Sequence, residues 1–291
     1  LVLAALAALG PAGPLALACM RRLGLSPAPL FCEMDGRFPN HHPDPTMPEN
    51  LTALVAEMKR TGARVGIAYD GDGDRMGAVD ERGEIIWGDK LMILFARAVL
   101  AEHPGATVLG EVKCSQTMYD DIAAHGGRPL MWKTGHSLIK TKMKEEGALL
   151  AGEMSGHLFF ADRYDGFDDA IYASLRLLEI VAASDRSLGE LLADVPRTFT
   201  TPELRVPCPD AIKFEVVRRV KEHYQRQGLP VVDIDGARIQ FASGPKPAWG
   251  LVRASNTGPV LVLRFEAHSE EERDRLRSEV EAVVAAERAR A

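Results

Sequence analysis

Short apolar segments alternate with longer amphipathic ones along most of this chain, and this order limits the fold more than any other feature. Residues 51–63 carry apolar side chains at helical spacing, and residues 64–70 (RVGIAYD) follow as a short apolar run. A helix, strand, helix order recurs over residues 89–105, 106–114 and 115–127. Strands that alternate with helices of this length are typical of α/β domains. We therefore predict mixed α/β domains, with functional loops at the carboxyl ends of strands.

The alternation continues and then changes near residue 200. Residues 198–210 (TFTTPELRVPCPD) are rich in Thr and Pro, as linkers often are. After them we expect a smaller α+β module with a charged helix, four strands and a final helix from residue 269. The remaining elements that we expect are a hairpin over 75–87, a strand over 128–135, a helix over 137–147, a strand–loop–strand over 148–160 and a helix over 168–184.

The first 20 residues (LVLAALAALGPAGPLALACM) carry no charge and are followed by Arg21 and Arg22. A membrane span or signal region is one interpretation. Gly and Pro at positions 10, 11, 13 and 14 interrupt the run, and no basic segment precedes it. We therefore favour a buried strand, a turn and a core helix that ends near Leu23 and Gly24, and no membrane contact. Because the chain begins with Leu rather than Met, we expect it to be a fragment.

Composition excludes some partners. The 291 residues carry a net charge of −6 with a pI near 5.8, and they contain no basic run, so nucleic acid is not an expected partner. The four cysteines are scattered without a CxxC pair, which favours reduced thiols and a cytoplasmic location. They are Cys19, Cys32, Cys114 and Cys208.

The segment DGDGDR places Asp70, Asp72 and Asp74 on alternate positions directly before Arg75. Carboxylates this close resist ionising together unless a cation lies among them. An EF-hand calcium loop would match these aspartates and Glu81, but its sixth position is Arg75 where glycine is needed, and a strand precedes it. A solvated acidic turn is the other alternative. We favour a Mg²⁺ site with open positions, beside which Arg75 faces a phosphate.

Two further loops carry polar side chains suited to a sugar phosphate. In GEMSGH (152–157), Glu153, Ser155 and His157 alternate and point to one side of an extended segment. A carboxylate and a hydroxyl can bind sugar hydroxyls, and a histidine can move a proton near neutral pH. A structural role for the histidine remains the alternative.

The segment KTGHSLIK (133–140) lies where a strand is expected to meet a helix, a junction whose backbone N–H groups favour anions. Lys113 is a further cation of the same domain, whereas Lys133 and Lys140 are expected to be solvated. The candidate residues of this junction are Thr134, Gly135 and His136.

The segment RASNTGP (253–259) combines a guanidinium, hydroxyls and an amide in a turn, which suits a phosphate monoester dianion. A turn rich in Ser and Thr is the alternative, but it leaves the arginine unexplained. The candidate residues are Arg253, Ser255, Asn256 and Thr257.

In their order and spacing these four loops resemble those of the α-D-phosphohexomutases. The chain is most similar to the bifunctional phosphomannomutase/phosphoglucomutases, a similarity that residues 31–51 (FCEMDGRFPNHHPDPTMPENL) strengthen. The resemblance runs from about residue 13 to the end. It implies a heart-shaped enzyme of four domains, the first of which carries a phosphoserine in a Thr-Ala-Ser-His-Asn-Pro loop. No such loop occurs in this sequence. The only Ser-Gly-His, at 155–157, belongs to the segment GEMSGH, which the resemblance identifies as the sugar loop.

The resemblance therefore implies the last three domains: domain II with the metal loop over 1–84, domain III with the sugar loop over 85–200 and domain IV with the phosphate loop over 201–291. It implies Mg²⁺ held by the three aspartates. Sugar contacts would come from Glu153 and Ser155, and the non-reacting phosphate would lie on the loop at 253–257. His157 is the candidate acid and base. The other candidate catalytic residues are Arg75 beside the metal and Lys113 and His136 lining the cleft, and Thr134 and Gly135 are candidate substrate-binding residues.

The implied reaction interconverts hexose 1-phosphate and hexose 6-phosphate, of glucose or mannose, through glucose 1,6-bisphosphate or mannose 1,6-bisphosphate. Since the phosphoserine is absent from these residues, we expect the chain to bind Mg²⁺ and a phosphohexose without turnover, and to need the missing serine domain as a partner. A catalytically inactive, Mg²⁺-dependent phosphosugar-binding protein is the alternative.

Overall fold

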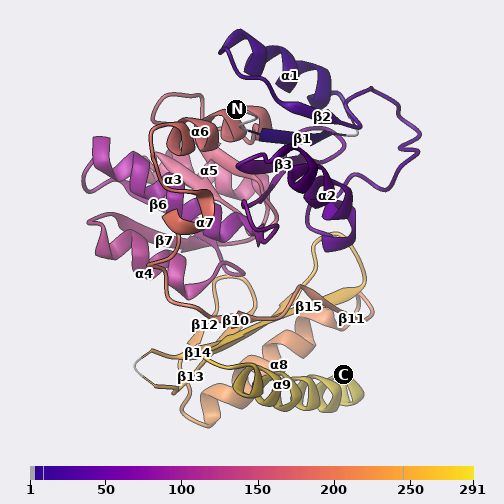
Figure 1. The fold of residues 1–291 in the computed structure, drawn as a ribbon. Helices are drawn as coiled ribbons and strands as arrows, with labels where there is room; N and C mark the ends of the chain where they lie inside the picture. Colours follow the sequence, from indigo (N-terminus) through magenta and orange to yellow (C-terminus); the bar gives the residue numbers. More distant parts are fainter. Residues whose placement is uncertain (1–3, 9, 245) are drawn as a thin grey trace. The chain divides into compact units, whose positions relative to one another are not determined.

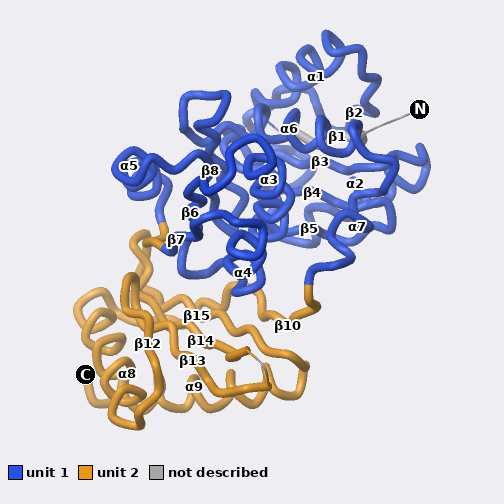
Figure 2. The backbone as a smooth tube through the Cα atoms, turned by 90° about the vertical axis from the view of Figure 1, so that its left-hand side faces the viewer, with its two compact units in different colours: residues 1–131, 135–195 blue, residues 132–134, 196–291 orange. Residues whose placement is uncertain are grey.

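The computed structural model describes residues 4–8, 10–244 and 246–291. The chain divides into two compact units (Figure 2). Unit 1 comprises residues 1–131 and 135–195, and unit 2 comprises residues 132–134 and 196–291.

The first sheet of unit 1 has the strand order β2-β1-β3-β4-β5 (Figure 2). Strand β1 pairs in parallel with β2 and β3, whereas β3, β4 and β5 are antiparallel neighbours. All five residues of β3 are buried, which explains its unbroken apolar sequence. The elements of this part are β1 (Ala4–Ala8), α1 (Ala12–Arg22), β2 (Ala28–Leu30), η1 (Pro48–Leu51), α2 (Thr52–Thr61), β3 (Val65–Tyr69), β4 (Met76–Val79) and β5 (Ile85–Ile86).

The second sheet of unit 1 has the order β7-β6-β8-β9, with β6 parallel to β8 and β8 antiparallel to β9. Its core is continuous with that of the first sheet, since buried side chains of α1, β3, α3 and α6 form one cluster. The elements are α3 (Gly88–Glu102), β6 (Thr107–Glu111), α4 (Gln116–Ala124), β7 (Arg128–Trp132), α5 (His136–Glu146), β8 (Leu150–Gly152), β9 (Leu158–Phe160), α6 (Ala170–Ala182) and α7 (Leu188–Leu191).

Unit 2 is an antiparallel sheet of order β10-β15-β14-β13-β12, and β11 also pairs with β15. Helices α8 and α9 cover one face of it (Figure 1), where Val220 and Val280 pack among apolar side chains of the strands. The elements are β10 (Phe199–Thr200), β11 (Leu204–Pro207), α8 (Lys213–Arg226), β12 (Val231–Val232), β13 (Ala237–Phe241), β14 (Ala248–Ala254), β15 (Val260–Ala267) and α9 (Glu270–Arg290).

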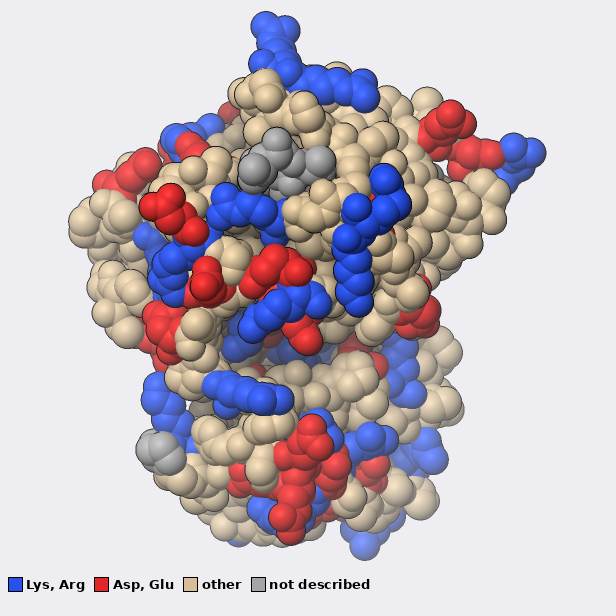
Figure 3. All heavy atoms as spheres, in the orientation of Figure 1, with Lys and Arg blue, Asp and Glu red and all other residues tan. Residues whose placement is uncertain are grey.

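The structure confirms the α/β alternation and the α+β module. The uncharged N-terminal segment contains strand β1 and helix α1, as the strand–turn–helix interpretation predicts. Among the described residues, no helix has the length and apolar character needed to cross a bilayer. Acidic and basic side chains are interspersed over the face seen in Figure 3.

One sequence-based expectation was wrong, and one helix begins later than expected. Residues 198–210 are not an unstructured linker, because they contain strands β10 and β11, and Leu204 and Val206 alternate toward the core of unit 2. The helix expected from residue 168 begins at Ala170, because Asp169 caps it by accepting a hydrogen bond from the Tyr172 amide at 2.8 Å. Asp168 therefore lies in the preceding loop.

Candidate active site

Asp70 organises the loop between β3 and β4. Its carboxylate is buried, and Oδ1 accepts hydrogen bonds from the amides of Gly73, Asp74 and Arg75 at 2.9, 3.1 and 3.2 Å. The Asp70 amide donates to the Arg75 carbonyl at 3.2 Å and closes the turn. Gly73 has a φ of 82°, which a glycine adopts without strain. The spacing of glycine and aspartate thus produces a tight turn that carries three carboxylates.

The carboxylates of Asp70, Asp72 and Asp74 converge, because one oxygen of each lies within 4.8 Å of the others. Burial, together with the negative charge of Asp70 and Asp72, raises the pKa of Asp74 to about 7. Burial acts to raise the pKa of Asp70 as well, but hydrogen bonds from Arg75 and Asp74 outweigh it and lower that pKa. Three carboxylates of which one retains a proton near neutrality form a donor set that fits a hard divalent cation.

Arg75 is held on both sides by carboxylates. Its Nε donates to Asp70 Oδ2 at 2.7 Å, and its Nη1 lies 3.5 Å from Asp44 Oδ1. Asp44 belongs to the segment before α2, and sequence reasoning did not assign it to the site. The Arg75 side chain remains 27% exposed, so it can still meet an anion.

The metal loop and the sugar loop, which are expected in different domains, are joined within unit 1. The Met76 amide donates to the Gly156 carbonyl at 3.1 Å, and Arg75 forms a β-bridge with His157. As a result, His157 Nδ1 lies 3.6 Å from Asp74 Oδ2. The candidate acid and base is therefore next to a candidate metal ligand.

Asp168 connects two candidate histidines and a lysine. Its Oδ2 lies 3.2 Å from Nδ1 of both His136 and His157, and its Oδ1 accepts from Lys140 Nζ at 2.8 Å. The two imidazoles stack with centroids 5.6 Å apart. Burial acts to lower the pKa of His157, but the carboxylates of Asp168, Glu153 and Asp74 outweigh it and raise that pKa.

Two conclusions differ from the sequence analysis. Lys140 is not simply solvated, because it is paired with Asp168. Asp168 itself was missed, since it was placed inside a helix. The acidic run DGFDD just before that helix is the signal that could have revealed it.

Glu153 brings Gly135 to the sugar loop. It is buried, with Oε1 accepting from the Gly135 amide at 2.7 Å and Oε2 accepting from Ser155 Oγ at 3.0 Å. A carboxylate has about four lone-pair positions, so it can also accept hydrogen bonds from sugar hydroxyls.

Lys113 lies deeper than a cleft-lining cation would. It is 5% exposed, and its Nζ is 3.8 Å from Glu111 Oε1. The same Glu111 carboxylate accepts from the Lys113 amide at 2.7 Å and from the Met154 amide at 3.3 Å. Glu111, which sequence reasoning also missed, therefore ties the end of β6 to the sugar loop.

In unit 2, Arg253 is buried at the end of β14. Its Nε donates to Asp235 Oδ2 at 3.0 Å, and the Thr134 amide donates to the same oxygen at 3.0 Å. Its Nη2 is buried and has no hydrogen-bond partner among the described residues. A buried donor of this kind is costly unless an acceptor reaches it, which points to an anion.

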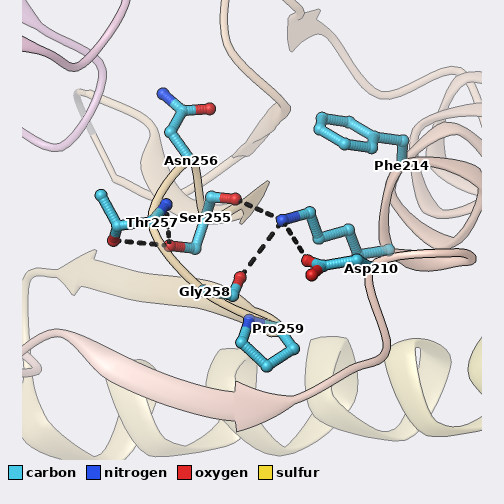
Figure 4. A pocket seen from close by; sticks show the side chains of 8 residues that line it. Asp210, Phe214, Ser255, Asn256, Thr257, Gly258 and Pro259 are labelled. Atoms are coloured by element: carbon cyan, nitrogen blue, oxygen red, sulfur yellow. Dashed lines mark hydrogen bonds and ion pairs between the residues drawn. The ribbon is translucent and has the colours of Figure 1, made fainter.

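The turn after Arg253 presents further donors. Ser255 Oγ accepts from the Thr257 amide at 3.2 Å and lies 3.3 Å from Thr257 Oγ1, while Asn256 and Thr257 are exposed. Figure 4 shows this turn beside Asp210 and Phe214, with which it lines a pocket of about 590 Å³.

The predicted site residues thus form two groups. In unit 1 the structure brings together the metal loop, the sugar loop and Gly135 with His136, whereas Lys113 lies beneath them. In unit 2 it brings together Thr134 and the candidate phosphate loop.

Comparison with known proteins identifies the family. Family models of phosphoglucomutase/phosphomannomutase match residues 1–83 (α/β/α domain II), 87–199 (α/β/α domain III) and 203–283 (C-terminal domain). This chain belongs to the phosphoglucomutase/phosphomannomutase family.

Two curated relatives and one solved structure are similar over nearly the whole chain. A phosphomannomutase/phosphoglucomutase of Pseudomonas putida is 50% identical over 268 residues, which cover 92% of this chain and 57% of the relative. A phosphoglucomutase of Neisseria gonorrhoeae is 46% identical, over 94% of this chain and 59% of the relative. The crystal structure of a family protein from Burkholderia thailandensis has a TM-score of 0.89 at 43% identity, over 98% of this chain and 60% of that protein. The chain therefore spans a little over half the length of these relatives.

Proposed function

We propose that this chain supplies the metal, sugar and phosphate sites of a phosphohexose mutase, an isomerase that interconverts the 1-phosphate and 6-phosphate of glucose, mannose or both. The observation that carries this proposal is the joining of the metal loop to the sugar loop, with Asp74 3.6 Å from His157. Phosphoryl transfer to a sugar hydroxyl needs charge stabilisation and proton transfer at one place, and this junction offers both.

Asp70, Asp72 and Asp74 would hold Mg²⁺. When bound, the cation would neutralise charge on the transferring phosphoryl group. Arg75 would add a positive charge next to it, in a position fixed by Asp70 and Asp44.

His157 would move the proton. Its Nδ1 faces Asp168 and Asp74, so Nε2 is the nitrogen available to the substrate hydroxyl. In the forward step the hydroxyl oxygen forms a bond to phosphorus, the bond from phosphorus to the serine oxygen breaks, and Nε2 accepts the hydroxyl proton. In the second step the serine oxygen would form a bond to the phosphorus at the other position of the bisphosphate, the bond from that phosphorus to the sugar oxygen would break, and Nε2 would return the proton to that oxygen.

Glu153 and Ser155 would bind sugar hydroxyls, and Gly135 and His136 would lie beside them. Lys113, which is buried beneath these loops, would act on the site through its ion pair with Glu111. In unit 2, Arg253, Ser255, Asn256 and Thr257 would hold the phosphate that does not react, with the Thr134 segment beside them. The binding energy of that remote phosphate would position the reacting end.

The phosphoserine would come from a segment outside these 291 residues, so the chain by itself would bind a phosphohexose without turning it over. We retain domain boundaries at 84/85 and 200/201 as part of this proposal. We also propose a cytoplasmic location, because the cysteine spacing shows no disulfide framework.

Calorimetric titration with glucose 1-phosphate, with Mg²⁺ and then with EDTA, tests the binding sites. We expect saturable binding that weakens in EDTA, and weaker binding by the Glu153→Gln variant. Glu145→Gln on the exposed side of α5 is the matched control and should bind like the unmodified chain. Absence of binding under all conditions, in a folded chain, would contradict the proposal.

A further inference from the structure

Lys213 is a buried lysine at an unfavourable place. It is the first residue of α8 and is 6% exposed. A cation at the N-terminus of a helix opposes the helix dipole, and its burial adds a desolvation cost. Such a lysine needs compensating contacts, and these contacts indicate what it does.

The compensation comes from the candidate phosphate loop (Figure 4). Lys213 Nζ donates to the carbonyls of Ser255 at 2.7 Å and Gly258 at 3.2 Å, and it forms an ion pair with Asp210 Oδ1 at 2.6 Å. Two of the three ammonium N–H donors are thus directed to carbonyls of the turn, and the ion pair with Asp210 offsets the buried charge. Although Lys213 lines the pocket, its hydrogen bonds go to the backbone of the turn.

Its contacts fix both ends of the turn. The Ser255 and Gly258 carbonyls point to one ammonium group, and the Ser255 amide donates to the Val260 carbonyl at 3.0 Å. In a trans peptide the C=O and the following N–H point in opposite directions. Holding the Ser255 carbonyl on Lys213 therefore turns the Asn256 amide away from the lysine.

We propose that Lys213 is a positioning residue of the phosphate site, which fixes the turn at 255–258 so that its donors are set before a phosphate group arrives. This inference rests on the proposed function of that loop. A turn held in its binding geometry loses less conformational entropy on binding, so the contribution of Lys213 is to affinity rather than to direct contact.

The test follows backbone amide signals of Ser255, Asn256 and Thr257 by NMR while the chain is titrated with glucose 6-phosphate. In the unmodified chain we expect saturable shifts. In Lys213→Met we expect the loop signals to be displaced before ligand is added and the affinity to fall about tenfold. Lys221→Met, on the same helix but outside the loop contacts, is the control and should change neither.

The outcomes separate this inference from the proposed function. If the unmodified chain shows no shifts at the loop, the proposed function fails. If it binds and Lys213→Met binds equally well with unchanged loop signals, the role of Lys213 is refuted while the proposed function stands.

A measurement without any variant covers the case in which Lys213→Met does not fold. The Lys213 ammonium should give a slowly exchanging NMR signal, because the side chain is 6% exposed and donates to two carbonyls. Exchange as fast as that of Lys221 would overturn the inference.

Discussion

Mg²⁺ affinity should depend on pH through Asp74. The pKa of this carboxyl is raised to about 7, so its proton must leave before a cation can bind. At about pH 6 the carboxylate is ionised in about a tenth of the molecules, and at about pH 8 in about nine tenths. Mg²⁺ affinity should therefore rise about tenfold over this interval. The raised pKa of His157 acts in the same direction, because an imidazolium next to the site repels the cation.

Calorimetry in two buffers of different ionisation enthalpy measures both the affinity and the protons released. We expect about one proton released per Mg²⁺ near pH 6 and almost none near pH 8. Asp74→Asn should weaken binding and abolish the pH dependence, whereas Asp165→Asn, an exposed carboxylate outside the cluster, should change neither. Affinity that is constant between about pH 6 and pH 8 with no proton release would refute the reasoning.

Three further variants test the geometry of the site. Gly156→Ala should lower the free energy of unfolding by roughly 3 kcal/mol, because φ is 97° and the new methyl group would lie 2.3 Å from the main-chain oxygen of Met76. Gly126→Ala is the control: φ is 78°, but the space around it is open, so the free energy of unfolding should fall by only roughly 1 kcal/mol. Urea unfolding compares the two, and equal costs would contradict this account. Asp168→Asn should lower the pKa of His157 in an NMR titration, since the carboxylate raises it; an unchanged pKa would show that the pair does not interact. Arg253→Lys should weaken glucose 6-phosphate binding by roughly tenfold, because lysine lacks the guanidinium fork, and unaltered affinity in calorimetry would exclude Arg253 from the phosphate site.

Loops with a dense local pattern could be predicted from the sequence. The run DGDGDR indicates a cation site because its charged residues are close together in the chain. In the structure, one oxygen of each aspartate lies within 4.8 Å of the others. The candidate phosphate loop was likewise recognisable, because its polar residues lie within one turn. Strand β3 was predictable because both of its faces are buried.

Residues that act through long-range contacts could not be predicted in the same way. Asp168, Glu111 and Lys213 each reach a site loop from another part of the chain, and their local sequence does not indicate which groups they contact. Strands β10 and β11 were missed for a related reason, since Thr and Pro composition predicts a linker whereas pairing with β15 decides the structure.

A coupled assay for conversion of glucose 1-phosphate to glucose 6-phosphate tests the central proposal most directly. It contains Mg²⁺ and a trace of glucose 1,6-bisphosphate, with an EDTA control, and compares the chain alone with the chain plus a phosphoserine domain from a relative. We predict no turnover by the chain alone and Mg²⁺-dependent turnover once the serine domain is supplied. Turnover by the chain alone would reveal a nucleophile within these residues and contradict the mechanism. Failure in both conditions, together with Mg²⁺-dependent binding, would instead indicate a phosphosugar-binding protein without mutase activity.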